Sequence, residues 1–138
     1  MKRVFADTSY WIAYLRKEDQ WANASNRAIN KLAQKGIFEV VTTETVLIEV
    51  LNYFSEFRSE IKKFTAETVE SFLNDEEMLV LHHNHEDFLK ALTLYKSRLD
   101  KGYSLTDCVS MNTMRELGII EVLTNDQHFE QEGFTKLF

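Results

Sequence analysis

The chain has 138 residues and a net charge of −6, and 44% of its residues are hydrophobic, including ten Phe and five Tyr. This composition excludes a disordered protein and predicts one globular domain over residues 1–138 with a single core. No apolar run is long enough to span a bilayer, and the single Cys108 cannot form an internal disulfide, so we expect a cytoplasmic protein without membrane contact. The acidic balance argues against a broad basic face for nucleic acid but leaves room for a local basic rim.

Strand-like and helix-like segments alternate in the first half of the chain. The polar residues 7–9 follow an apolar strand and have the chemistry of a helix cap, and Gly36 is a stop signal for a helix. The predicted elements are a strand over Lys2–Ala6, a helix from Tyr10 to Leu15, a helix over Trp21–Gln34, a strand over Phe38–Val41, and helices over Glu44–Phe57 and Ser59–Leu73.

The second half continues the alternation, with Lys101-Gly102 as a break between two helices. Its predicted elements are a strand over Met78–Leu81, a helix over His85–Leu99, a helix from Ser104 to near Gly118, a strand over Ile119–Leu123 and a final edge strand over Phe134–Phe138. Strands that alternate with helices predict an α/β fold with a mostly parallel central sheet covered on both faces, that is, a three-layer α/β/α sandwich.

Four acidic residues have conspicuous positions in these predicted elements. Asp7 and Asp126 follow predicted strands, Asp107 lies at the start of a predicted helix, and Glu49 lies within one. The carboxyl ends of the strands in an open α/β sheet border one crevice, so residues far apart in sequence can meet there. Carboxylates held close together raise one another's pKa unless a cation lies among them. The pattern therefore indicates a site for a hard divalent metal, Mg²⁺ or Mn²⁺.

Each acid also has a structural explanation when taken alone. Asp7 could be a helix N-cap, Asp107 could belong to a capping box with Ser104, and Asp126 could be an ordinary turn residue after a strand. Glu49 could lie on a solvated polar stripe of its helix. These alternatives stay open for the individual residues, so the joint occurrence of the four acids carries the argument.

The neighbours of these acids resemble those of a known family. The motifs are Phe5-Ala6-Asp7-Thr8-Ser9, Ile48-Glu49-Val50, Leu105-Thr106-Asp107, and Thr124-Asn125-Asp126 followed by Phe129. With them, essentially the whole chain resembles the PIN-domain ribonucleases, and especially the small VapC-type toxins of toxin–antitoxin pairs. Glu49 matches the helical glutamate of the family, and Glu44 is close enough to be an alternative.

The resemblance implies a PIN-like fold and a metal-dependent endoribonuclease that an antitoxin holds inactive. It implies that Asp7, Glu49, Asp107 and Asp126 bind Mg²⁺ or Mn²⁺ directly or through water and form the catalytic site. A metal-bound water ionises readily and the metal neutralises charge on the phosphate, so no covalent nucleophile is needed. RNA, an antitoxin and a second copy of the chain are the implied partners. The residues expected to support the metal ligands or to contact phosphate are Thr8, Ser9, Thr106 and Asn125.

Two alternative functions are a catalytically inactive PIN-fold binding module and, less favoured, a phosphatase with Asp7 as nucleophile. Such phosphatases place a second Asp two positions later, where this chain has Ser9. Several other conspicuous residues are expected to be structural. They are His82, His83 and His85, which lack a complete zinc set, Cys108 as a small packed residue, His128 as a loop residue, and Tyr10, Trp11 and Tyr14 as core or subunit-interface residues.

Overall fold

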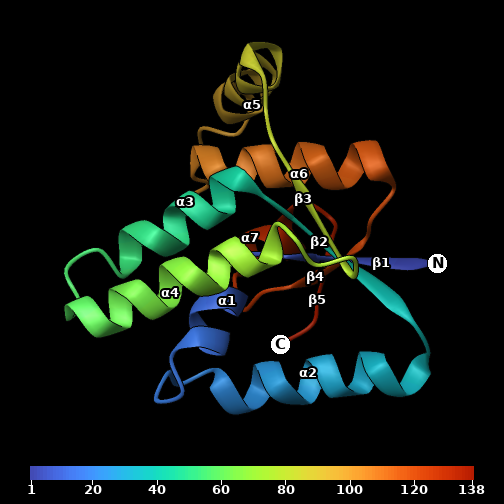
Figure 1. Ribbon diagram of the computed structural model, residues 1–138. Helices are drawn as coiled ribbons and strands as arrows, with labels where there is room; N and C mark the ends of the chain where they lie inside the picture. The colour runs from blue at the N-terminus through green and yellow to red at the C-terminus, as the bar shows by residue number, and fades with distance from the viewer.

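The computed structural model describes residues 1–138, and five strands alternate with seven helices along them (Figure 1). The strands are β1 (Lys2–Ala6), β2 (Phe38–Thr43), β3 (Met78–Leu81), β4 (Glu121–Leu123) and β5 (Thr135–Lys136). The helices are α1 (Thr8–Leu15), α2 (Ala22–Lys35), α3 (Glu44–Tyr53), α4 (Ser59–Phe72), α5 (His85–Ser97), α6 (Leu105–Leu117) and α7 (Gln127–Gln131).

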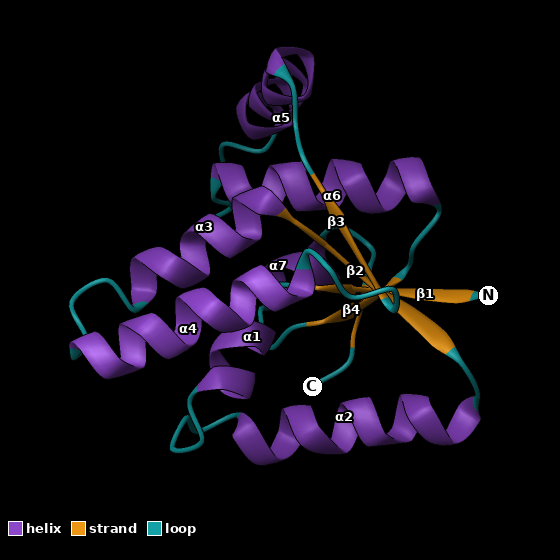
Figure 2. Ribbon diagram, in the orientation of Figure 1, coloured by secondary structure: helices purple, strands orange, loops and turns teal.

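All five strands pair in parallel in the order β3-β2-β1-β4-β5. The central strand β1 is apolar, and Val4, Phe5 and Ala6 are completely buried, as expected where helices cover both faces of a parallel sheet. Figure 2 shows the strands between α2 on one side and α6 on the other. The predicted three-layer α/β/α fold is therefore confirmed, and the sheet has no antiparallel strand.

The strand order reverses its direction at β1. The chain moves from β1 to β2 and β3 on one side, and returns later to place β4 and β5 on the other side. The carboxyl ends of β1 and β4 are adjacent, because Ala6 pairs with Leu123 and the Asp7 amide donates to the Leu123 carbonyl at 3.1 Å. Such a switch point opens a crevice beside the strand ends, which is where open α/β sheets bind ligands.

A buried hydroxyl joins the two strands and the helix that meet beside this crevice. Thr42 on β2 donates its hydroxyl to the Ala6 carbonyl at 2.9 Å and accepts a hydrogen bond from the Trp11 indole at 3.3 Å. Trp11 and Tyr10 belong to the core, so they are not subunit-interface residues, whereas Tyr14 is exposed. None of the helices combines the length and the apolarity that crossing a bilayer requires.

Several predicted boundaries were wrong for local reasons. Strand β2 continues to Thr43, whose hydroxyl then caps α3 by accepting from the Val46 amide at 3.1 Å. Helix α3 ends at Tyr53 because the chain turns there to bury Phe54. Ile119 and Ile120 precede β4, and β5 covers only two of the five predicted residues. Helix α7 was not predicted at all.

Candidate active site

The structure brings the four predicted acids to one cleft. Asp7 follows β1 directly, Asp126 comes after β4, Asp107 lies in the first turn of α6, and Glu49 lies in the middle of α3. The cleft has a volume of about 700 Å³, and Ile12 is the one hydrophobic residue of its lining. Its lining consists of Asp7, Thr8, Ser9, Ile12, Glu49, Gly102, Ser104, Asp107, Asn125, Asp126, Gln127, His128 and Gln131.

Helix geometry separates Glu49 from the alternative Glu44. Glu44 begins α3, is exposed and does not line the cleft. Glu49 is half-buried, and one of its carboxylate oxygens accepts a hydrogen bond from the Thr8 hydroxyl at 2.5 Å. Thr8, at the start of α1, thus fixes a carboxylate that belongs to a different helix, α3.

Asp7 stands at the N-cap position of α1, yet its side chain makes no capping hydrogen bond, so the capping alternative was wrong for this residue. Asp7 as a whole is 4% exposed, and its carboxylate accepts from the Thr124 hydroxyl at 3.0 Å. The Ser9 hydroxyl lies 3.0 Å from that of Thr124, and it accepts from the Asn125 amide at 3.2 Å. A chain of hydroxyls therefore orients Asp7 toward the cleft rather than toward its own helix.

The other two aspartates do have capping roles. Asp107 forms a capping box with Ser104, in which each side chain accepts the amide of the other residue at 3.0 Å. Asp126 is the N-cap of α7 and accepts from the His128 amide at 2.9 Å. A carboxylate has two oxygens with several acceptor positions, so a capping bond leaves capacity for a cation. Capping and metal binding are therefore compatible at both residues.

Burial and the charges of neighbouring acids make two of the carboxylates, those of Asp7 and Asp107, costly to ionise. Burial, together with the charges of Asp107 and Asp126, raises the pKa of Asp7 to about 7. Burial also raises the pKa of Asp107, and the charges of Asp126 and Glu49 act in the same direction. Neither aspartate has a Lys or Arg partner; the only basic side chain near the acids is that of His128. Binding of a cation from solution would therefore stabilise the charged carboxylates of the cleft.

His128 was expected to be a loop residue, but it lies in α7 and faces the acids. Its Nδ1 atom is 3.2 Å from an Asp126 oxygen and 3.5 Å from an Asp107 oxygen, and it is buried without a hydrogen-bond partner. The ligand atoms of these three residues lie within 4.8 Å of one another, a spacing at which one metal ion could contact all of them. A side-chain carbon at Gly102 would come within 3.0 Å of His128 Nε2, so this glycine leaves room for the imidazole.

The remaining predicted residues divide into two groups. Thr8, Ser9 and Asn125 line the cleft and take part in the hydrogen bonds described above. Thr106 is half-buried in the first turn of α6 and does not line the cleft. Cys108 is fully buried, and burial followed by the charge of Asp107 raises the pKa of its thiol to about 11, which suits a packed residue rather than a nucleophile.

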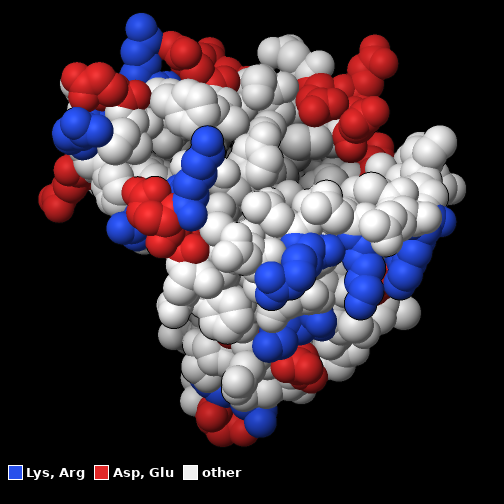
Figure 3. All heavy atoms as spheres, turned by 90° about the horizontal axis from the view of Figure 1, so that it is seen from below, with Lys and Arg blue, Asp and Glu red and all other residues white.

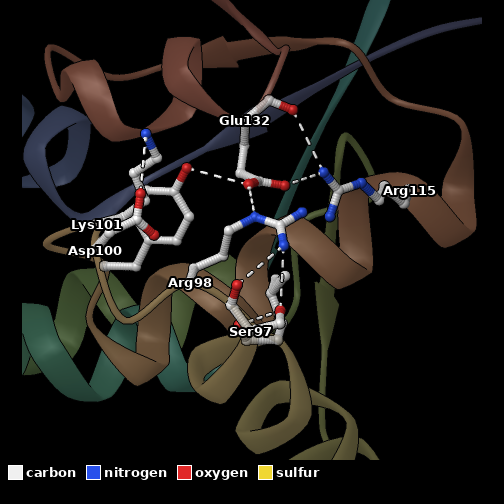
Figure 4. A network of polar contacts seen from close by, with 8 residues as sticks. Ser97, Arg98, Asp100, Lys101, Arg115 and Glu132 are labelled. Carbon is white, nitrogen blue, oxygen red and sulfur yellow. Dashed lines mark hydrogen bonds and ion pairs between the residues drawn. The ribbon is translucent and has the colours of Figure 1, made fainter.

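An ion-pair network centred on the buried Glu132 side chain holds α7 against neighbouring elements (Figure 4). Glu132, whose side chain is 5% exposed, accepts from Arg98 Nε at 2.6 Å and from the Tyr103 hydroxyl at 3.2 Å, and it also pairs with Arg115. Burial disfavours the Glu132 carboxylate, but the bonds and charges of Arg115 and Arg98 outweigh it and lower its pKa. The network joins the end of α5, the loop before α6, α6 and α7, and thereby fixes the segment that carries Asp126 and His128.

Comparison with known proteins identifies the family. The model of the PIN domain family matches residues 4–134. The chain belongs to the PIN domain family. The fold also matches the crystal structure of VapC20 from Mycobacterium tuberculosis, a toxin that cleaves the sarcin-ricin loop, with a TM-score of 0.82, 23% identity, and coverage of 96% of this chain and 97% of that one. No curated protein sequence matches the chain. The family and fold predicted from the sequence motifs are thus confirmed.

The raised pKa of Asp7 predicts how stability depends on pH. The unperturbed value is 3.8 and the folded value is about 7, so between these values the folded protein keeps a proton that the unfolded chain loses. Without metal, the free energy of unfolding should fall as pH rises from about 4 to 7, by at most about 4 kcal/mol. Asp7→Asn should lack this decrease in the free energy of unfolding, and it should be more stable than wild type at pH 8.

Urea unfolding in EDTA across this pH range measures the effect. Glu44→Gln is the matched control, because it removes one negative charge from an exposed residue outside the cleft. Parallel pH profiles for wild type and Asp7→Asn would contradict the prediction.

Proposed function

We propose that the protein is a metal-dependent endoribonuclease that hydrolyses RNA phosphodiester bonds and acts as the toxin of a toxin–antitoxin pair. The observation that carries the proposal is the cluster of four carboxylates without a Lys or Arg partner at the switch point of a PIN-family sheet. The toxin activity of VapC20, which has the same fold, supports RNA as the substrate. A nuclease with such a substrate would act in the cytoplasm.

The residues of the cleft fit a divalent metal. They supply carboxylate oxygens, which Mg²⁺ and Mn²⁺ prefer. Burial first, and then repulsion from the neighbouring acids, raises the pKa of Asp7 and Asp107, and a bound cation would favour their charged forms. In the proposal Asp7, Glu49, Asp107 and Asp126 hold the metal. When bound, the metal would supply an ionised water and neutralise charge on the scissile phosphate. Thr124 and Thr8 orient Asp7 and Glu49 by the hydrogen bonds described above.

The two alternative functions have less support. An inactive binding module would have no need to keep four repelling carboxylates in one cleft, since their repulsion costs stability. For a phosphatase with Asp7 as nucleophile, the second acid would have to stand at Ser9, whose hydroxyl instead bonds Thr124 and the Asn125 amide.

Removal of single carboxylate charges tests the nuclease proposal. Asp107→Asn keeps an oxygen for the capping box but loses a charge that would bind metal, so RNA cleavage should fall about 100-fold or more. Glu49→Gln should have a similar effect, whereas Glu44→Gln should cleave like wild type. Cleavage of total cellular RNA with Mg²⁺, Mn²⁺ or EDTA, followed by mapping of the cut ends, measures these rates. Equal cleavage by Asp107→Asn and wild type would refute the assignment.

We further propose that His128 is a nitrogen ligand of the same metal, because its unpartnered Nδ1 faces Asp107 and Asp126. Imidazole binds transition metals in preference to Mg²⁺. His128→Gln should therefore weaken Mn²⁺ binding, by about tenfold or more, and change Mg²⁺ binding little. Electron paramagnetic resonance for Mn²⁺ and calorimetry for Mg²⁺ measure the two affinities. Equal losses for both ions would assign His128 a general structural role instead.

We propose an antitoxin and a second copy of the chain as protein partners. An antitoxin Arg or Lys in the acidic cleft would compete with the metal through charge-assisted hydrogen bonds. A face of α5 with exposed Phe88, Leu92 and Tyr95 supports self-association, since monomers rarely expose such groups of apolar side chains. Light scattering at micromolar concentration should report a dimer, and Leu92→Lys should shift it toward the monomer. A monomeric wild type would refute the dimer and leave the nuclease proposal intact.

A further inference from the structure

Helix α2 has a composition unlike the rest of this acidic chain. The protein has 22 Asp and Glu residues against 16 Lys and Arg, yet no acid occurs between Asp19 and Glu39. Within this segment, α2 carries three basic residues, Arg27, Lys31 and Lys35. The other helices with Lys or Arg, namely α4, α5 and α6, also carry Asp or Glu. Helix α2 is thus the one helix whose charged residues are all positive.

The three basic residues follow one another at intervals of four, so they form one row along the helix. All three are exposed, and none of them forms an ion pair with an acid. A favourable interaction with the helix dipole explains a cation in the last turn, which is Lys35, but not Arg27 or Lys31. The row therefore has no structural partner within the protein.

A second row lies beside the first. It consists of three exposed polar residues that are also four positions apart: Asn26, Asn30 and Gln34. Asn30 follows Arg27 by three positions and Gln34 follows Lys31 by three, and residues three apart are neighbours on a helix surface. No hydrogen bond within the protein satisfies their side-chain amides. The exposed face of α2 is thus made of cations and amide groups, both of which bind nucleic-acid backbones.

The position of α2 relates this face to the cleft. Helix α1 begins at the cleft, where Ile12 contributes to the lining, and α1 packs against α2. In the view from below the molecule, where α2 is foremost, Lys and Arg side chains gather over this helix (Figure 3). The row runs along α2 away from the cleft, since α2 ends at Lys35 and β2 then begins at Phe38, which pairs with Lys2 at the amino end of β1. Only an RNA that extends beyond the cleft could therefore contact all three cations.

We propose that the exposed face of α2 binds the phosphate backbone of the RNA substrate outside the cleft, an inference that rests on the proposed nuclease function. Arg27, Lys31 and Lys35 would neutralise phosphates, and the amides of the neighbouring row would hydrogen-bond the same backbone. The acidic cleft repels RNA before a metal is bound, so a separate cationic surface solves the problem of initial capture.

The salt dependence of RNA binding tests the proposal. A fluorescein-labelled single-stranded RNA, long enough to leave the cleft, is titrated in EDTA so that no cleavage occurs, and fluorescence anisotropy reports the affinity. The test variant combines Arg27→Gln, Lys31→Gln and Lys35→Gln, and Gln keeps the helix propensity of these exposed positions. The slope of the logarithm of affinity against the logarithm of salt concentration should become shallower by about 2, because each lost phosphate contact removes about 0.7.

The matched control combines Arg58→Gln, Lys62→Gln and Lys96→Gln, which removes one Arg and two Lys that are likewise exposed and unpaired. Both triple variants have the same net charge, so a difference between them reports the location of the charge. A control with the wild-type slope supports the proposal. Equal slopes for the two variants, or an α2 variant that binds RNA like wild type but loses an acidic protein partner, would overturn it.

Cleavage of a trinucleotide with Mn²⁺ separates this inference from the proposed function. A trinucleotide is too short to reach α2, so the α2 variant should cleave it at the wild-type rate. If wild type cleaves no RNA at all, the nuclease proposal fails, while the anisotropy measured without metal still decides whether α2 binds RNA.

Discussion

The burial of one carboxylate, that of Asp7, is the constraint on which the candidate site depends. Val4, Phe5 and Ala6 are fully buried in the central strand, so the residue that follows them is held in the interior whatever its charge. Hydrogen bonds from the Thr8 backbone and the Thr124 hydroxyl offset only part of the cost, and Asp107 and Asp126 add repulsion. A cation that binds the folded chain would therefore reduce the electrostatic cost of the buried carboxylate. Metal binding would raise the free energy of unfolding, so binding and stability are coupled.

Secondary structure was predicted correctly from the sequence where hydrophobic patterns and helix-ending residues are local. Apolar strands such as Lys2–Ala6 and helices ended by Gly36 or Gly118 were predicted close to their observed bounds. The failures involve elements that tertiary contacts define. Helix α7 has only five residues, too few to show a helical period, and it depends on the Asp126 cap and on Glu132. The end of α3 depends on the burial of Phe54, which sequence periodicity does not distinguish from continued helix.

The approach of Asp7 and Asp126 was predictable because the carboxyl ends of parallel strands meet, a rule that needs no coordinates. The rule does not supply orientation. Only the structure separates Glu49 from Glu44, reveals that Thr124 holds Asp7, and turns His128 toward the acids. The Glu132 network joins residues 17 to 34 positions apart, so no local pattern indicates it. A histidine two residues after a capping aspartate was the available signal for His128, although the same spacing suits a surface turn.

The two edges of the sheet limit how copies of this protein can associate. One edge is β3, with four residues, and the other is β5, with two. Edge strands this short expose few free backbone donors and acceptors, and a strand added from a neighbouring molecule would gain few hydrogen bonds. Association through a continuous intermolecular sheet is therefore disfavoured, and so is the fibrous aggregation that begins with such pairing. Any assembly must instead rely on side chains presented by the helices, which makes its specificity open to change by single surface substitutions.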